Sequence, residues 1–319
     1  MRIATIDAGT NTVLLLITES TEKGVMRVLE DVHAIARMGE GVDERRAISR
    51  EGFERFQQVL RDHQDIIDKY DVQHVKLAAT SAMRDAANSA EVANLIKAEF
   101  GYETEIISGN EEAALTYRGA LIGFDAEEDK VLGVLDIGGG STEVSFGSIK
   151  HFVRGVSMQV GAVRMTERYL KTAPYEGEAV SKATLEVSQA VQAVAKELTV
   201  PDFLIAVAGT PTSLAAMNLG LTEFDATKVN GARLKLREVE AFLGASLTSS
   251  TERLLEHFPV INKARADILP AGTLILYSIM RMLKTEEIMV STRGLRYGLA
   301  IRDYERHYVT QPIKWQIAE

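Results

Sequence analysis

Two short loops carry the residue types that bind phosphate. They read Asp7-Ala8-Gly9-Thr10-Asn11-Thr12 and Asp136-Ile137-Gly138-Gly139-Gly140-Ser141-Thr142. Glycine lets the backbone approach an anion closely, the N–H groups form a concave nest of donors, and Thr and Ser hydroxyls add more. A single loop of this kind is equally well explained as a hairpin turn. Two loops with the same Asp-x-Gly start favour phosphate binding by both.

Three acidic residues adjoin these loops. Asp7 and Asp136 each follow an apolar run, and Glu143 comes just after the second glycine run. Strand alternation can return the Glu143 carboxylate to the side of Asp136. An oxygen-rich group of this kind suits Mg²⁺ or another divalent cation. We therefore expect Asp136, Glu143 and Asp7 to hold a metal, the alternative for Glu143 being a solvated strand residue.

Three further segments offer weaker signals. Glu111 and Glu112 fall in the first turn of a helix that Asn110 is suited to cap, where acidic residues complement the helix dipole or activate a water molecule. Spacing alone favours the dipole role. Arg84 follows a buried strand and is either a phosphate clamp or a surface charge. Gly209-Thr210 either contacts phosphate or a nucleoside, or simply ends a strand.

The elements around these residues alternate between strands and helices. Residues 3–17 and 132–146 both read as an apolar strand, a tight Asp-x-Gly turn and a second apolar strand, which suggests two similar domains. Between and after them we expect helices at 49–70, from Asn88 to Gly101, 161–170, 178–198 and 270–284. Strands are expected at 74–79, 104–107, 151–156, 203–208 and 287–291. This alternation predicts α/β sheets with helices on their faces.

Composition excludes several classes of protein. The chain has 319 residues, no cysteine, 46% apolar residues and a formal net charge of −9. Thiolate metal sites and thiol nucleophiles are therefore impossible. The charge argues against a nucleic acid polymer as partner. The start of the chain lacks a signal-peptide pattern and the apolar runs are short, so we expect a cytoplasmic protein without a membrane partner.

Four segments together resemble the exopolyphosphatase and guanosine pentaphosphate phosphohydrolase (Ppx/GppA) family, within the actin, hexokinase and Hsp70 superfamily. They are the two glycine-rich loops, the second continuing to Glu143, together with Ile106-Ile107-Ser108-Gly109-Asn110-Glu111-Glu112-Ala113 and Ile268-Leu269-Pro270-Ala271-Gly272. They span nearly the whole chain in the family's order. The resemblance implies two ribonuclease-H-like (actin-like ATPase) domains with a cleft between them.

The resemblance also implies roles for single residues. It makes Glu112 the base for the attacking water, and Asp136 and Glu143 the acidic pair that binds Mg²⁺. It makes Arg84 a phosphate contact, and it leaves Glu111 as helix structure. The two loops, from Gly9 to Thr12 and from Gly138 to Thr142, match the family's phosphate-binding loops. The chain resembles the short, two-domain members, which puts processive action on long polyphosphate in doubt.

We expect the first domain at residues 1–124, with a C-terminal helix at 300–319 that packs back on it, and the second at 125–299. The expected activity is an Mg²⁺-dependent exopolyphosphatase that releases terminal orthophosphate from inorganic polyphosphate. Three alternatives remain open: a guanosine pentaphosphate (pppGpp) 5′-phosphohydrolase, a small-molecule kinase of the same superfamily, and a sensor that binds polyphosphate or an alarmone without cleaving it. A homodimer would be unsurprising.

Overall fold

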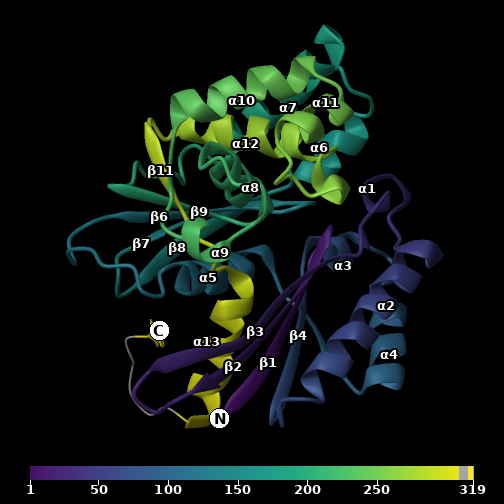
Figure 1. Ribbon diagram of the computed structural model, residues 1–319, viewed down its shortest axis with the longest axis vertical. Coiled ribbons are helices and arrows are strands. Elements are labelled where there is room, and N and C mark those ends of the chain that lie inside the picture. Colours follow the sequence, from purple (N-terminus) through teal and green to yellow (C-terminus); the bar gives the residue numbers. More distant parts are fainter. Residues whose placement is uncertain (309–314, 319) are drawn as a thin grey trace. The chain divides into compact units, whose positions relative to one another are not determined.

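The computed structural model describes residues 1–308 and 315–318. The chain forms two compact units: unit 1 comprises Met1–Asp125 and Arg293–Glu319, and unit 2 comprises Ala126–Thr292 (Figure 1). The chain returns to unit 1 after Thr292, whereas the expected return was after residue 299. The return occurs before the last long helix begins, so that this helix belongs to unit 1 along its whole length.

Unit 1 is built on a six-stranded mixed sheet in the order β12-β3-β2-β1-β4-β5. The first three strands form an antiparallel meander, and β4 and β5 extend it in parallel. Their bounds are β1 Arg2–Ala8, β2 Thr12–Ser20, β3 Val25–Ile35, β4 His74–Ala79, β5 Thr104–Ile106 and β12 Gln316–Ile317. The last strand corrects the expectation of helix through this part of 300–319, because Gln316 and Ile317 pair with β3 instead.

The helices of unit 1 lie on both faces of this sheet. They are α1 Val42–Arg45, α2 Arg50–Ile67, α3 Ser81–Asp85, α4 Ser89–Phe100, α5 Gly109–Ala120 and α13 Leu295–Tyr308. Alternate residues of β1 enter different cores: Ala4 and Ile6 pack with residues of α2 and α4, whereas Ile3 packs with residues of α13. Figure 1 shows these helices flanking the strands of the unit.

Two glycines let α5 and α13 pack at short range in unit 1. A Cβ atom on Gly119 of α5 would lie 2.2 Å from the Gly294 carbonyl oxygen. A Cβ atom on Gly298 of α13 would lie 2.0 Å from the Leu115 carbonyl oxygen. Because backbone meets backbone here, a side chain at either position would force the two helices apart.

Unit 2 repeats this architecture with a six-stranded sheet in the order β10-β11-β9-β6-β7-β8. The strands β6, β7 and β8 form an antiparallel meander, and β9 and β11 extend it in parallel beside β6. Their bounds are β6 Leu132–Ile137, β7 Thr142–Gly147, β8 Phe152–Met158, β9 Phe203–Val207, β10 Arg233–Lys235 and β11 Glu287–Val290. The shared meander and parallel extension confirm the repeat inferred from the sequence echo.

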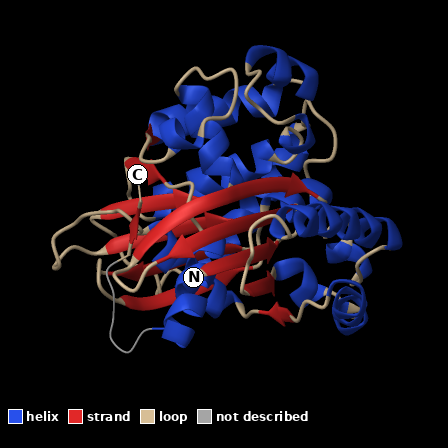
Figure 2. Cartoon of the chain, turned by 60° about the horizontal axis from the view of Figure 1, so that its bottom comes forward, coloured by secondary structure: helices blue, strands red, loops and turns tan. Residues whose placement is uncertain are grey.

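The helices of unit 2 surround one large apolar core. They are α6 Ala162–Arg168, α7 Gly177–Ala193, α8 Gly209–Asn218, α9 Ala226–Val229, α10 Leu236–Thr248, α11 Thr251–His257 and α12 Leu269–Met282, with a 3-10 turn at Lys263–Arg265. α12 is central: it packs against α6, α7, α8 and α10. Figure 2 shows helices in blue alongside the strands in red.

The structure corrects the expected Asn110 cap, and it also shows how Asn88, at the start of α4, uses its side chain. The Asn88 side chain does not cap α4, because it bonds the backbone N–H and carbonyl of Ile48 instead. Ser108 rather than Asn110 caps α5, and its hydroxyl accepts the N–H of Glu111. Among the described helices, none is long and apolar enough to cross a membrane.

Candidate active site

Glu112 is a buried carboxylate at the head of α5. Its side chain is 10% exposed, and its Oε2 accepts a hydrogen bond from Arg84 Nη1 at 2.6 Å. The same Arg84 nitrogen donates to the Ile107 carbonyl at 3.0 Å, which holds the guanidinium against the turn that precedes α5. Glu111 points elsewhere and pairs with Arg302 of α13. The two neighbouring glutamates therefore have different partners in the folded protein.

Burial controls the chemistry of Glu112. Burial raises the pKa of this carboxyl, and the charge and hydrogen bond of Arg84 act in the opposite direction, with a net pKa above the ordinary value. A carboxylate with a raised pKa is a stronger base when ionised. Arg84, expected as either a phosphate contact or a surface charge, is paired with Glu112 and has a side chain that is 18% exposed. The phosphate contact remains a prediction.

The first glycine-rich loop joins β1 to β2 in unit 1. It closes with a hydrogen bond of 3.0 Å from the Gly9 N–H to the Thr12 carbonyl. The carbonyls of Thr10 and Asn11 face the segment after β3, where they accept N–H groups of Ala36, Arg37 and Gly39. The N–H groups of Thr10 and Asn11 have no backbone or side-chain acceptor within residues 1–308 and 315–318. These two N–H groups are therefore available as donors to an anion.

The second loop joins β6 to β7 in unit 2 and has the same internal geometry. The Gly138 N–H bonds the Ser141 carbonyl at 3.0 Å. The carbonyls of Gly138 and Gly139 accept the first N–H groups of α6. In the described part of the chain, no acceptor faces the N–H groups of Gly139 and Gly140. The glycine loop is thus held by its carbonyls, with its donors directed away from α6.

Arg164 of α6 completes this anchorage. It is 5% exposed, and its Nε donates to the Gly140 carbonyl at 2.7 Å. The helix reaches the loop closely because Gly161 has no side chain: a Cβ atom there would lie 2.4 Å from the Gly139 oxygen. Arg164 could not be recognised from the sequence, because nothing in the local pattern around it marks a contact with residue 140.

The hydroxyls of Ser141 and Thr142, which we expect to contact phosphate, both have partners within unit 2. The Ser141 Oγ donates to Glu143 Oε1 at 2.7 Å, and the Thr142 Oγ1 donates to the Val160 carbonyl at 2.7 Å. Both side chains are buried, at 2% and 0% exposed. Because each hydroxyl has one hydrogen and uses it within unit 2, the donors that this loop still offers are its backbone N–H groups.

Asp136 and Glu143 are directly opposite each other on the antiparallel strands β6 and β7. Opposite residues of such a pair have their side chains on the same face, so the two carboxyl groups are neighbours. Glu143 is 2% exposed, and its Oε1 also accepts the Ser157 hydroxyl at 2.7 Å. The two carboxyl groups are neighbours, as expected, because their residues are opposite each other on adjacent antiparallel strands.

The described residues contain no group of three or more His, Cys, Asp or Glu side chains that could hold a metal ion alone. This does not disagree with Mg²⁺, which is usually bound by one or two carboxylates, with water and substrate phosphate completing the octahedron. Asp136 and Glu143 provide hard oxygen ligands of that kind in unit 2. Asp7, at the end of β1, is a carboxylate of unit 1.

Gly209-Thr210 begins α8, and its backbone is closely surrounded. A Cβ atom on Gly209 would lie 1.6 Å from Nη1 of Arg265, so the arginine occupies the side-chain space of this glycine. Ala208 just before it has φ of 70°, a left-handed backbone that favours glycine. Burial lowers the pKa of Arg265. Arg265 is a second cation that sequence analysis missed.

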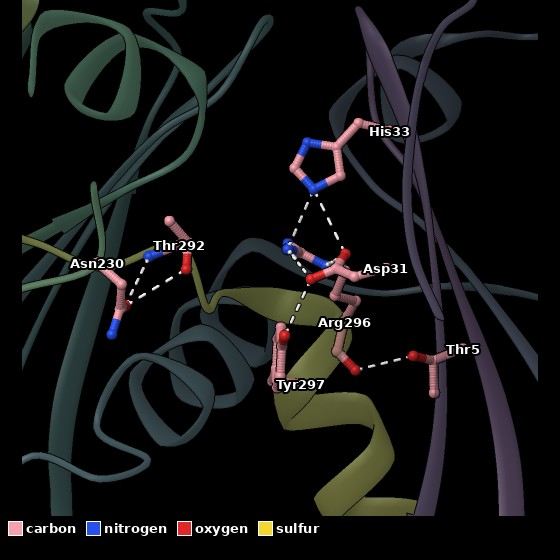
Figure 3. A network of polar contacts seen from close by, with 7 residues as sticks. All are labelled: Thr5, Asp31, His33, Asn230, Thr292, Arg296 and Tyr297. Atoms are coloured by element: carbon pink, nitrogen blue, oxygen red, sulfur yellow. Dashed lines mark hydrogen bonds and ion pairs between the residues drawn. The ribbon is translucent and has the colours of Figure 1, made fainter. Parts of the chain in front are cut away.

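An ion pair within unit 1 supports the strand that leads into the first loop (Figure 3). Arg296, at the start of α13, donates through Nε and Nη2 to both oxygens of Asp31 at 2.8 and 2.9 Å. Tyr297 donates to the same carboxylate at 2.9 Å, and Thr5 of β1 donates to the Arg296 carbonyl at 2.9 Å. Arg296 also interacts electrostatically with Asp7. The start of α13 is therefore fastened to β1, the strand that leads into the first loop.

Asn230 makes a separate link within unit 2, also drawn in Figure 3. Its Oδ1 accepts the backbone N–H of Thr292 at 3.1 Å and the Thr292 hydroxyl at 3.3 Å. This contact fixes the last residue of unit 2 to the loop after α9. Thr292 therefore contributes to the structure of unit 2 through this contact.

Comparison with known proteins gives consistent results. Residues 16–307 match the family model described as the Ppx/GppA phosphatase family. The chain is 31% identical over 323 residues to Exopolyphosphatase 2 of Mycobacterium tuberculosis, covering 94% of this chain and 98% of the relative.

Solved structures agree with the fold. An exopolyphosphatase from Cytophaga hutchinsonii has a TM-score of 0.88 at 26% identity and covers 98% of this chain and 100% of its own. The Ppx/GppA family member of Aquifex aeolicus has a TM-score of 0.81 at 27% identity, covering 96% and 98%. These relatives confirm the expected two-domain, actin-like α/β fold. With most of its length matched by the family model, and with the glycine loops and buried acids in place, the chain belongs to the Ppx/GppA phosphatase family.

Proposed function

We propose that this protein is an exopolyphosphatase that removes terminal orthophosphate from inorganic polyphosphate with the help of a divalent cation, Mg²⁺ in the first instance. The observation that carries the proposal is the buried Glu112, held by Arg84 at 2.6 Å at the head of α5. A buried carboxylate with a raised pKa and one fixed oxygen is suited to deprotonating water.

Family membership makes the chain a phosphoanhydride hydrolase, and the name of the Mycobacterium tuberculosis relative supports polyphosphate as the substrate class. Phosphoryl transfer depends mainly on positioning and on stabilising charge at the transferred group. The N–H groups of Thr10, Asn11, Gly139 and Gly140 are donors of the required kind. In the proposal they bind the non-bridging oxygens of the substrate.

The acidic residues of the two loops hold the cation in this proposal. Asp136, Glu143 and Asp7 are the residues that would hold it. A bound Mg²⁺ offsets the negative charge of the phosphates. Glu112 accepts a proton from the attacking water, whose oxygen bonds to the terminal phosphorus. The phosphoanhydride bond to the rest of the chain breaks, and orthophosphate and the shortened chain are released.

The test is orthophosphate release from medium-chain polyphosphate, with Mg²⁺ and with excess chelator, by the wild type and by Glu112→Gln. The variant should fold normally and lose about 10²-fold or more in turnover, because a glutamine cannot accept the proton. Glu111→Gln is the matched control: it makes the same change one residue away, on a side chain that pairs with Arg302. It should retain near-normal turnover.

Near-normal turnover by Glu112→Gln would remove Glu112 as the base. Release from guanosine pentaphosphate but not from polyphosphate would move the substrate to the alarmone. Tight polyphosphate binding without release by the wild type would mean a sensor, and ATP-dependent phosphorylation of a small molecule would mean a kinase.

A further inference from the structure

Unit 2 contains a cavity that lies apart from the glycine loop and the acidic pair. It has a volume of about 360 Å³ and lies between α8 and α10, over β10. Both helices pack against α12, but the cavity separates their facing sides. Its size falls in the range of small-molecule sites, which begins near 300 Å³.

The interior of the cavity is apolar and well buried. Leu214 and Met217 of α8 form one wall, Val239 and Phe242 of α10 form the other, and Leu234 of β10 lies at the base. All five are less than 9% exposed. Water inside such a lining has few hydrogen-bond partners, so an apolar group that displaces it gains free energy.

One acidic side chain marks the cavity. Glu238, in the first turn of α10, accepts the Lys235 N–H through Oε2 at 2.9 Å, which fixes the orientation of the carboxylate. Its other oxygen, Oε1, has no hydrogen-bond donor among the described residues. A half-buried carboxylate beside an apolar cavity favours a cation or an N–H donor and disfavours an anion.

The wall formed by α10 leaves the cavity accessible. Ala241 and Ala245 line it and are exposed, so the helix presents small side chains between Glu238 and the end of the cavity near Phe258. Larger residues at these two positions would fill the space. The cavity is therefore open on the side of the carboxylate, because no side chain closes it there.

We propose that this cavity is a binding site for a small amphipathic cation, with an aromatic or branched aliphatic body and an amino or amidino group. The body occupies the space between α8 and α10, and the cationic group bonds Glu238 Oε1. Its apolar and acidic character excludes polyphosphate and nucleoside phosphates as ligands. The site is thus independent of the proposed phosphate chemistry, and its ligand is of the opposite charge.

The test uses 2-naphthylmethylammonium as the probe and isothermal titration calorimetry on the full chain. Neutral 2-naphthylmethanol and anionic 2-naphthylacetate are the matched analogues. The cation should bind saturably at one site per chain, the alcohol more weakly, and the anion not at all. Equal binding of the cation and the anion, or no saturable binding of the cation, would overturn the proposal.

Two variants assign the binding to this cavity. Glu238→Gln removes the charge but keeps the capping hydrogen bond, because glutamine serves in a capping box as well as glutamate. The affinity for the cation should fall about tenfold, because a charge-assisted hydrogen bond is lost. The affinity for the neutral alcohol should not change, because the alcohol makes no such bond. Ala241→Trp should abolish binding of both by filling the space, from an exposed position that the fold tolerates.

Glu22→Gln is the control for general electrostatics. It removes the same charge from an exposed side chain of unit 1. It should leave the affinity for the cation unchanged. Cation binding that is unaffected by both Glu238→Gln and Ala241→Trp would place the ligand elsewhere and refute the site. Because binding is measured directly, these outcomes do not depend on whether the protein releases orthophosphate.

Discussion

At the scale of single residues, the pair of Glu112 and Arg84 shows how charge and burial oppose each other. Burial favours the neutral carboxyl, and the guanidinium favours the carboxylate. The balance keeps the base ionisable while desolvation strengthens it. Either effect alone would give a worse base: a carboxyl that stays protonated, or a weakly basic carboxylate.

Replacing Arg84 with Met removes the interaction that lowers the pKa of Glu112 and leaves the burial that raises it. The pKa of Glu112 should rise further, so the base becomes active only at higher pH. The acid limb of the profile of kcat/KM against pH should therefore move upward by about one pH unit or more. Arg84→Lys keeps a positive charge and should move the limb less. An unchanged limb in Arg84→Met would separate Arg84 from the base.

At the scale of elements, the short helix α6 acts as an anchor for the second phosphate loop. Its first N–H groups bond the carbonyls of Gly138 and Gly139, and Arg164 bonds that of Gly140. The segment after β3 does the same for the first loop through N–H groups of residues 36–39. In both units the segment that comes after the meander orients the loop, which explains how flexible glycine residues can present fixed donors.

Arg164→Met should lower kcat/KM for phosphate release by about 10²-fold, because a loop displaced by about 1 Å misplaces the phosphate. Affinity for tripolyphosphate, measured by calorimetry, should fall with it. Arg168→Met on the same helix is the control: that side chain pairs with Glu186 near the surface and should have little effect. Loss of thermal stability without loss of affinity would make Arg164 a structural residue only.

At the scale of the whole molecule, the two ends of the chain build one unit. Asp31 of β3 and Arg296 of α13 are 265 residues apart and form a bidentate ion pair in which Arg296 is buried and Asp31 is partly exposed. Burial by itself raises the pKa of Asp31, but hydrogen bonds from His33 and Arg296 and the positive charge of Arg296 outweigh it, so the pKa lies well below its usual range.

Asp31→Asn should destabilise unit 1 by about 3–5 kcal/mol, because Arg296 remains buried without its countercharge. The depressed pKa means that the pair contributes fully above about pH 4 and loses its contribution as the pH falls further. Hydrogen exchange of the β1 to β3 amides should show the loss, with unit 2 amides unchanged. Glu54→Gln in the exposed pair with Arg50 should change protection by less than about 1 kcal/mol. Equal effects of the two substitutions would contradict a special role for the buried pair.

Much of the fold and part of the site could be predicted from local patterns. The strand β4 is predictable at the residues where it occurs, 74–79, because a short, mainly apolar run between turns is a local signal. The two glycine-rich turns and the Asp-x-Gly repeat were visible for the same reason. The role of Glu112, by contrast, came from family resemblance, since an acidic residue in a first helical turn is ordinary.

The sequence by itself determined most of the strands, the repeated turn and the residues able to bind phosphate, because each depends on neighbours within a few positions. It did not predict β3, β10 or β12. The tertiary structure alone decided the partners: Arg84 with Glu112, Arg164 with Gly140, Arg265 with Gly209 and Arg296 with Asp31. An arginine side chain is long and can reach many carboxylates and carbonyls, so its partner is fixed by how distant elements pack. The same packing buries Glu112 and leaves the cavity between α8 and α10.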